Sequence, residues 1–218
     1  MQAAPDIVEV QFPFLCLSLF AEVAGQTGVR ACATLKRMTT RSFLMLAPAA
    51  VLALGAHAME LAPAGFFVQG GVAERATYTV TAGVVWPWSW RREIGNSGEL
   101  TGITEGFVSH WSARGADDRQ SLTQIGVLPM LRYRGERGRS AWFIEGGIGV
   151  SVMDRIYATP DKQFSTRFNF VDVIGVGRSF GPQQRREVSL RISHVSNAGI
   201  KNPNPGENLL QLRYAAMF

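Results

Sequence analysis

The C-terminal segment "SHVSNAGIKNPNPGENLLQLRYAAMF", residues 193–218, holds residue types that serve nucleophilic catalysis. His194 and Ser196 stand two positions apart at the end of an apolar run, and Glu207 follows a turn rich in Pro, Gly and Asn. Side chains at i and i+2 of a strand share a face, which brings an imidazole near a hydroxyl. Serine becomes nucleophilic when a base takes its proton, and a carboxylate can hold that base in the required tautomer. The spacing therefore predicts Ser196 as nucleophile and His194 as base.

The turn between the two strands supplies further candidates. Glu207 begins the next antiparallel strand, where it can come beside His194 and orient it. Asn197, Gly199 and Asn204 carry amide groups that could stabilise an oxyanion. A structural interpretation of the same residues stays open, since His and Ser are tolerated on a barrel surface near lipid head groups.

The elements that must position these residues are strands. Period-two alternation recurs through residues 59–218, which contain 20 glycines and no long helical pattern. In residues 142–152, for example, Trp142, Ile144 and Ile148 oppose Glu145 and Gly147. Turn-rich segments separate the runs, and the expected strands cover residues 65–75, 76–90, 98–112, 120–134, 141–154, 164–180, 186–197 and 207–218.

Such alternation suits either a soluble barrel or a membrane barrel, and several features favour the membrane. The strands are long enough to cross a bilayer when tilted. The expected interior face carries charges that a dry core would not hold unpaired, namely Arg132, Glu145, Arg191 and Arg213. Aromatic residues near strand ends fit an interfacial girdle, and they are Trp86, Trp88, Trp90, Trp111, Tyr133 and Trp142. We expect an all-β fold, an eight-stranded antiparallel transmembrane β-barrel of the outer membrane, whose interior is filled by side chains.

The N-terminal part of the chain differs from the rest. Residues 38–58 have a charged start at Arg41, an apolar run and a terminal "AHA", which is the pattern of a cleaved signal peptide. We expect residues 1–37 to be an upstream extension, residues 38–58 the signal peptide and residues 59–218 the barrel domain. Both cysteines, Cys16 and Cys32, precede the cleavage site, so the mature chain would form no intramolecular disulfide.

Other chemistries find little support. No Cys/His/Asp cluster has metal-ligand spacing, and the sequence predicts no metal and no nucleic-acid partner. His110 is expected to be an interfacial structural residue. The glycine-containing run at 175–181 is expected to be a strand end, because no helix follows it as a phosphate-binding loop requires.

Strand parity predicts which way the candidate residues point. Leu190 and Ile192 share the phase of His194 and Ser196, whereas Arg191 has the opposite phase. The His and Ser should therefore face lipid. In a barrel with an even number of strands both termini lie on the periplasmic side, so the turn at 197–206 would face outside. A nucleophile at that level would meet the acyl esters of outer-leaflet lipid.

The segment "HVSNAGIKNPNPGENLLQLRY" resembles the C-terminal signature of PagL-type lipid A 3-O-deacylases of Gram-negative outer membranes. That family reads His-x-Ser-Asn-Ala-Gly, then a turn with Lys, Pro and Asn, then Glu on the last strand. The resemblance implies an eight-stranded barrel that removes the 3-hydroxyacyl chain ester-linked at position 3 of lipid A without a cofactor. It implies Ser196 as nucleophile, His194 as base and Glu207 as the orienting acid, with lipid A or lipopolysaccharide of the outer leaflet as partner. A homodimer stays open.

One position departs from the family pattern. A known family member carries its glutamate one residue later relative to the histidine, where this chain has Asn208. Parity raises the same question, because Asn208 shares the lipid-facing phase of Leu210. We expect Glu207 to take the orienting role, since a carboxylate stabilises imidazolium better than an amide, with Asn208 as the alternative. The alternatives to the deacylase are a small structural or adhesive barrel without enzyme activity, and acyl transfer between lipids.

Overall fold

The computed structural model describes residues 62–115 and 117–218. The expected extension at 1–37 and the signal peptide at 38–58 lie outside the described residues. Within the described ranges, no helix is long and apolar enough to cross a membrane.

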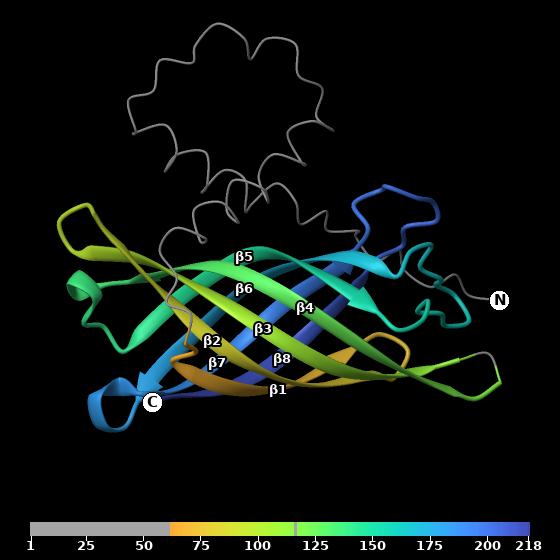
Figure 1. The fold of residues 1–218 in the computed structure, drawn as a ribbon, viewed down its shortest axis with the longest axis horizontal. Coiled ribbons are helices and arrows are strands. Elements are labelled where there is room, and N and C mark those ends of the chain that lie inside the picture. The colour runs from red at the N-terminus through yellow and green to blue at the C-terminus, as the bar shows by residue number, and fades with distance from the viewer. Residues whose placement is uncertain (1–61, 116) are drawn as a thin grey trace, which may run out of the picture. The chain divides into compact units, whose positions relative to one another are not determined.

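Eight antiparallel strands close into a barrel in which each strand pairs with its neighbours in sequence and β8 pairs with β1, as Figure 1 shows. The strands are β1 (Gly65–Ala73), β2 (Thr77–Ile94), β3 (Gly98–Arg114), β4 (Arg119–Arg134), β5 (Trp142–Met153), β6 (Phe168–Phe180), β7 (Arg186–Ser196) and β8 (Glu207–Met217). Two short 3₁₀ helices, η2 (Glu136–Gly138) and η3 (Pro182–Gln184), lie in the connections. The predicted fold class is confirmed, and most strand ends agree within two residues.

The largest differences from the predicted boundaries occur at β2 and β6. β2 continues to Ile94, past a register shift between Pro87 and Arg91. β6 begins at Phe168 because residues 154–167 form a loop that folds back on the barrel. In that loop Tyr157 and Phe164 are buried, and their ring centroids are 4.9 Å apart. Burial of Phe164 therefore comes from the loop and not from a longer strand.

The two faces of the strands differ in polarity, as the alternation predicts. Exposed apolar side chains cover the outside of the barrel, among them Val68, Val80, Val108, Ile125, Ile144, Ile174, Leu190, Ile192, Leu210 and Leu212. The inward positions of β7 and β8 include Ser189, Arg191, Gln211 and Arg213, all of which are buried. An apolar exterior around a polar interior is the pattern of a membrane barrel.

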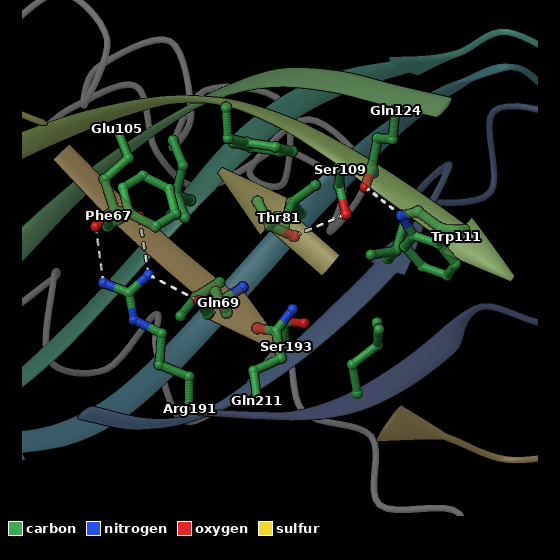
Figure 2. Close-up of a pocket in the computed structure, with 16 residues that line it drawn as sticks. Phe67, Gln69, Thr81, Glu105, Ser109, Trp111, Gln124, Arg191, Ser193 and Gln211 are labelled. Carbon is green, nitrogen blue, oxygen red and sulfur yellow. Dashed lines mark hydrogen bonds and ion pairs between the residues drawn. The ribbon is translucent and has the colours of Figure 1, made fainter. Parts of the chain in front are cut away.

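Ion pairs fill the middle of the barrel. Arg191 bridges Glu105 and Glu145 with nitrogen–oxygen distances of 2.8 Å to each, and Arg132 joins Glu145 to Glu187 at 2.8 and 2.7 Å. Figure 2 shows Arg191 reaching Glu105 and Gln69 beside a small internal cavity. The cavity measures about 30 Å³ and is lined by polar and apolar side chains in equal number, so it has room for water but not for an acyl chain. The charged interior expected from the sequence is confirmed.

Tryptophans lie on both the outer and the inner face of the barrel. A Cβ at Gly102 would collide with the ring of Trp88, and one at Gly106 with the ring of Trp86, so these two rings pack against glycines on the outward face. Trp142 is 61% exposed. Trp111 was expected in the same girdle, but it is buried in the interior, where its indole N–H donates to Gln124 at 2.9 Å. That expectation is wrong because Trp111 shares the inward phase of Ser109 and Glu105.

Candidate active site

The candidate residues gather at one end of the barrel, which we call the loop end. It includes residues 74–76, 154–167 and 197–206 and the connection from β3 to β4, and it lies opposite the end with the C terminus (Figure 1). The connection at 197–206 joins β7 to β8 and is followed at once by Glu207. It places the end of β7 beside the start of β8.

His194 pairs across this hairpin with Asn208. The two residues are register partners, and the distance from His194 Nδ1 to Asn208 Oδ1 is 2.7 Å. With the amide assigned this way, its oxygen accepts a hydrogen bond, so Nδ1 carries the proton and Nε2 keeps a lone pair. The pair therefore fixes the tautomer in which Nε2 can act as a base.

Gly206 provides the space that the His194 ring occupies. A Cβ built on Gly206 would lie 2.5 Å from Cε1 and 2.9 Å from Nε2 of the imidazole. Gly206 also has φ +64°, a left-handed conformation that side chains disfavour. Both observations require glycine here, and the ring is held between Gly206 and Asn208.

Ser196 is the last residue of β7 and has the same outward phase as His194. It is 7% exposed, and the backbone N–H of Ala198 donates to its Oγ at 3.5 Å. Among the described residues, no hydrogen bond joins the Ser196 hydroxyl to the His194 ring. Catalytic hydrogen bonds are often long before substrate binds, so this spacing is compatible with a nucleophile and base pair.

Asn197 organises the loop instead of presenting its amide to a ligand. Its Nδ2 donates to Ser165 Oγ and to the Lys201 carbonyl, both at 2.8 Å, and its Oδ1 accepts the backbone N–H of Gly199 at 2.9 Å. Both amide hydrogens of Asn197 and the N–H of Gly199 are therefore in use. The structure does not offer these two candidates as free oxyanion donors.

Asn204 is better placed for that task. Its Oδ1 accepts the backbone N–H of Asn197, the residue after Ser196, at 2.9 Å. This bond holds the half-exposed Asn204 amide next to the nucleophile. Among the described residues, nothing hydrogen-bonds to its Nδ2, which leaves two donors for a ligand.

Glu207 does not lie beside His194, and the expected placement is wrong. The alternation of β8 sends Glu207 into the barrel, where it is 1% exposed and sits opposite Val195. Its carboxylate accepts the Tyr157 hydroxyl at 2.8 Å and pairs with Lys162 at 3.5 Å. Burial, together with the nearby Glu207 charge, raises the pKa of Tyr157. Glu207 thus anchors the loop at 154–167.

Two residues around His194 were missed in the sequence. Gly206 was noted as part of the turn but not as a contact of the ring. Asp172 on β6 is the register partner of His194 on the other side of β7. The signal for Asp172 was present, because it is a carboxylate in an outward phase otherwise occupied by Phe168, Phe170 and Ile174.

His110 is the other histidine among the described residues. His110 is exposed on the outside of β3, between Val80 and Thr123, away from the site. No group of three or more His, Cys, Asp or Glu side chains in residues 62–115 and 117–218 could hold a metal ion.

Comparison with known proteins places the chain in a family. A family model described as lipid A 3-O-deacylase (PagL) matches residues 75–216, which include every residue of the site. The lipid A deacylase PagL of Bordetella bronchiseptica is 38% identical over 141 residues, covering 64% of this chain and 75% of that protein. The lipid A deacylase PagL of Pseudomonas aeruginosa is 31% identical over 173 residues, covering 78% of this chain and 96% of that protein.

A solved structure agrees with these matches. The crystal structure of the outer membrane enzyme PagL aligns with a TM-score of 0.62 and 27% identity, covering 71% of this chain and 100% of that one. The family model spans more than half of the chain, and the P. aeruginosa relative is matched over nearly its whole length. This chain belongs to the PagL family of lipid A 3-O-deacylases.

Proposed function

We propose that this protein is an outer-membrane hydrolase that removes the 3-hydroxyacyl chain ester-linked at position 3 of lipid A. The observation that carries the proposal is the His194 ring, held between Asn208 and Gly206 on the outside of the barrel, two residues from Ser196. Family membership supplies the substrate class, and this geometry supplies a base and a nucleophile at the lipid surface.

The reaction follows the two-step course of serine esterases. His194 Nε2 takes the proton of Ser196 Oγ as that oxygen attacks the ester carbonyl, and the Asn204 amide stabilises the resulting oxyanion. The protonated His194 then gives its proton to the departing sugar oxygen, which leaves an acyl group on Ser196. Water, deprotonated by His194, attacks this ester, and the protonated His194 then returns a proton to Ser196 Oγ as the 3-hydroxy fatty acid is released.

Asn208 takes the orienting role in this mechanism. It is the residue in contact with Nδ1, while Glu207 is bound to Tyr157 inside the barrel. An amide can fix the histidine tautomer, as in Cys-His-Asn enzymes. It carries no charge, so it stabilises the imidazolium less than a carboxylate would.

We place the site at the outer leaflet. Bacterial barrels have short periplasmic turns and longer extracellular loops. The two longest connections, residues 154–167 and 197–206, both lie at the loop end, and the C terminus lies at the other end. Ser196 and His194 stand at the border between the loop end and the apolar exterior. That position suits an ester just below the sugar of lipid A.

Removal of the nucleophile tests the function. In cells expressing Ser196→Ala, mass spectrometry of lipid A should find no loss of the 3-hydroxyacyl chain, with kcat roughly 10⁴-fold or more below the parent. His194→Asn should be as inactive, and the double variant no worse, because nucleophile and base act as one unit. Both variants should stay heat-modifiable on gels, which reports a folded barrel. Full deacylation by Ser196→Ala would leave the non-enzymatic barrel as the better description.

The Asn208 assignment has its own test. Asn208→Ala should lower kcat by roughly 10- to 100-fold, because Nδ1 loses the acceptor that fixes the tautomer. Glu207→Ala is the comparison, since it changes the neighbouring residue without touching the ring. A fully active Asn208→Ala together with an inactive Glu207→Ala would return the orienting role to Glu207.

A further inference from the structure

We propose that Asp172 is the charged positioning residue of the site, acting on His194 from β6 while Asn208 holds it from β8. This inference rests on the proposed function. Two residues then share the roles that one carboxylate has in a catalytic triad. Asn208 fixes the tautomer of His194, and Asp172 stabilises the His194 imidazolium.

The register of the barrel puts the three residues in one row. Asp172 pairs with His194 across β6 and β7, and His194 pairs with Asn208 across β7 and β8. Directly opposed residues of antiparallel strands have Cβ atoms roughly 4.5–5.5 Å apart on the same face. His194 therefore stands between a carboxylate and an amide, both pointing outward.

The surroundings of Asp172 offer the carboxylate little besides the site. On the outward face its neighbours along β6 are Phe170 and Ile174, and its partner on β5 is Ile148. The residues diagonal to it on β7 are Ile192 and Ser196. The polar neighbours of Asp172 on this face are thus His194 and Ser196, the two residues of the proposed catalytic pair.

The Asp172 carboxylate lies on the lipid-facing side of β6. Polar and charged groups on the lipid face of a barrel are costly, and they are kept where they pair or function. Among the described residues, neither a hydrogen bond nor a salt bridge reaches the Asp172 carboxylate, and the ionisable side chain directly opposite it on β7 is His194. The compensating charge appears when His194 takes the serine proton. Asp172 therefore favours the state that forms during the reaction over the resting state.

The first measurement is the kinetics of Asp172→Asn with purified, detergent-solubilised full-length protein. A unit charge about 5 Å away at an effective dielectric near 20 changes the stability of the imidazolium enough to lower kcat roughly 100-fold. KM for lipid A should stay within about threefold, because the effect is on the charged state and not on substrate binding. Asp118→Asn, at an exposed turn, is the matched control and should retain parental kcat.

The second measurement does not involve lipid A. Labelling of Ser196 by a fluorophosphonate probe reports how well the serine is activated, and Asp172→Asn should slow it by a factor similar to the loss in kcat. Restoring a carboxylate next to Nδ1 should compensate, so Asn208→Glu in the Asp172→Asn background should regain most of the labelling rate and of kcat. A carboxylate with only a structural or substrate-binding role would not be rescued from β8.

The outcomes separate this inference from the proposed function. Parental kcat in Asp172→Asn, a change confined to KM, or unchanged labelling would each overturn the role of Asp172 while leaving Ser196 and His194 in place. A parent protein without deacylase activity, or an active Ser196→Ala, would overturn the proposed function itself. Should Asp172→Asn fail to fold, Asp172→Leu suits the apolar face of β6 and gives the same comparison.

Discussion

Replacement of Gly206 by alanine tests whether the site depends on the position of the His194 ring. The new Cβ would lie 2.5 Å from Cε1 and 2.9 Å from Nε2, whereas carbon atoms in contact are separated by roughly 3.5–4.0 Å. The ring must therefore move by about 1 Å. Such a shift would displace the ring from the position in which Nδ1 lies 2.7 Å from Asn208 Oδ1. A misplacement of about 1 Å can cost roughly 100-fold in rate, which is the loss expected here in kcat/KM.

The backbone strain of the substitution has to be separated from the collision. Gly206 has φ +64°, and alanine in that region costs about 1–2 kcal/mol of stability. Gly95, in the turn between β2 and β3, has φ +59° and open space around its Cβ position. Gly95→Ala therefore carries the strain without the collision and should keep its activity. Mass spectrometry of deacylated lipid A measures the rate, and heat-modifiability measures folding. Equal activity of the two variants would refute the argument that Gly206 positions the ring.

Two further predictions concern groups inside the barrel. Glu207→Gln should keep deacylase activity within several-fold but speed proteolysis within residues 154–167, because the ion pair with Lys162 that anchors this loop is lost. Arg191→Met should lower the free energy of unfolding, measured by urea titration, by about 3–5 kcal/mol, since the buried Glu105 and Glu145 each lose one of two arginine partners. Arg75→Met breaks the exposed pair with Asp161 and should cost about 0–1 kcal/mol in the same urea titration.

The strands could be predicted from the sequence because the signal is local. Alternation with a period of two and turn segments rich in Gly, Pro and charge mark most of the strands, although the turn at 74–76 is poorly marked and residues 98–112 alternate badly. The polar phase correctly located Arg132, Arg191 and Arg213 in the interior. The start of β6 could not be read in this way. Phe164 is apolar and precedes β6, but it packs against Tyr157 of the same loop, a contact that depends on the tertiary fold.

Where the residue type and the strand phase predicted different positions, the structure follows the phase. Trp111 was assigned to the membrane girdle by its type, yet its phase is that of Ser109, and it is buried inside. Glu207 was preferred over Asn208 because it carries charge, yet the outward phase of β8 belongs to Asn208. A shift of one residue exchanges the two faces of a strand, so in a barrel the phase outweighs the residue type.

Asp172 was not identified from the sequence for a different reason. On the strand after His194 a partner is easy to find from the sequence, because a hairpin joins β7 to β8. A strand in a closed barrel has two neighbours, and the one before it is set by the connection at residues 181–185, with its 3₁₀ turn at Pro182–Gln184. One residue more or less in that turn would move the outward carboxylate away from His194. The predicted strand ends at 180 and 186 agree with the structure, but the conformation of the turn, which sets the register, was not predicted, so the pairing of Asp172 with His194 came from the structure. In a barrel enzyme whose histidine lacks a carboxylate on one side, the strand on the other side is therefore the place to look for charge.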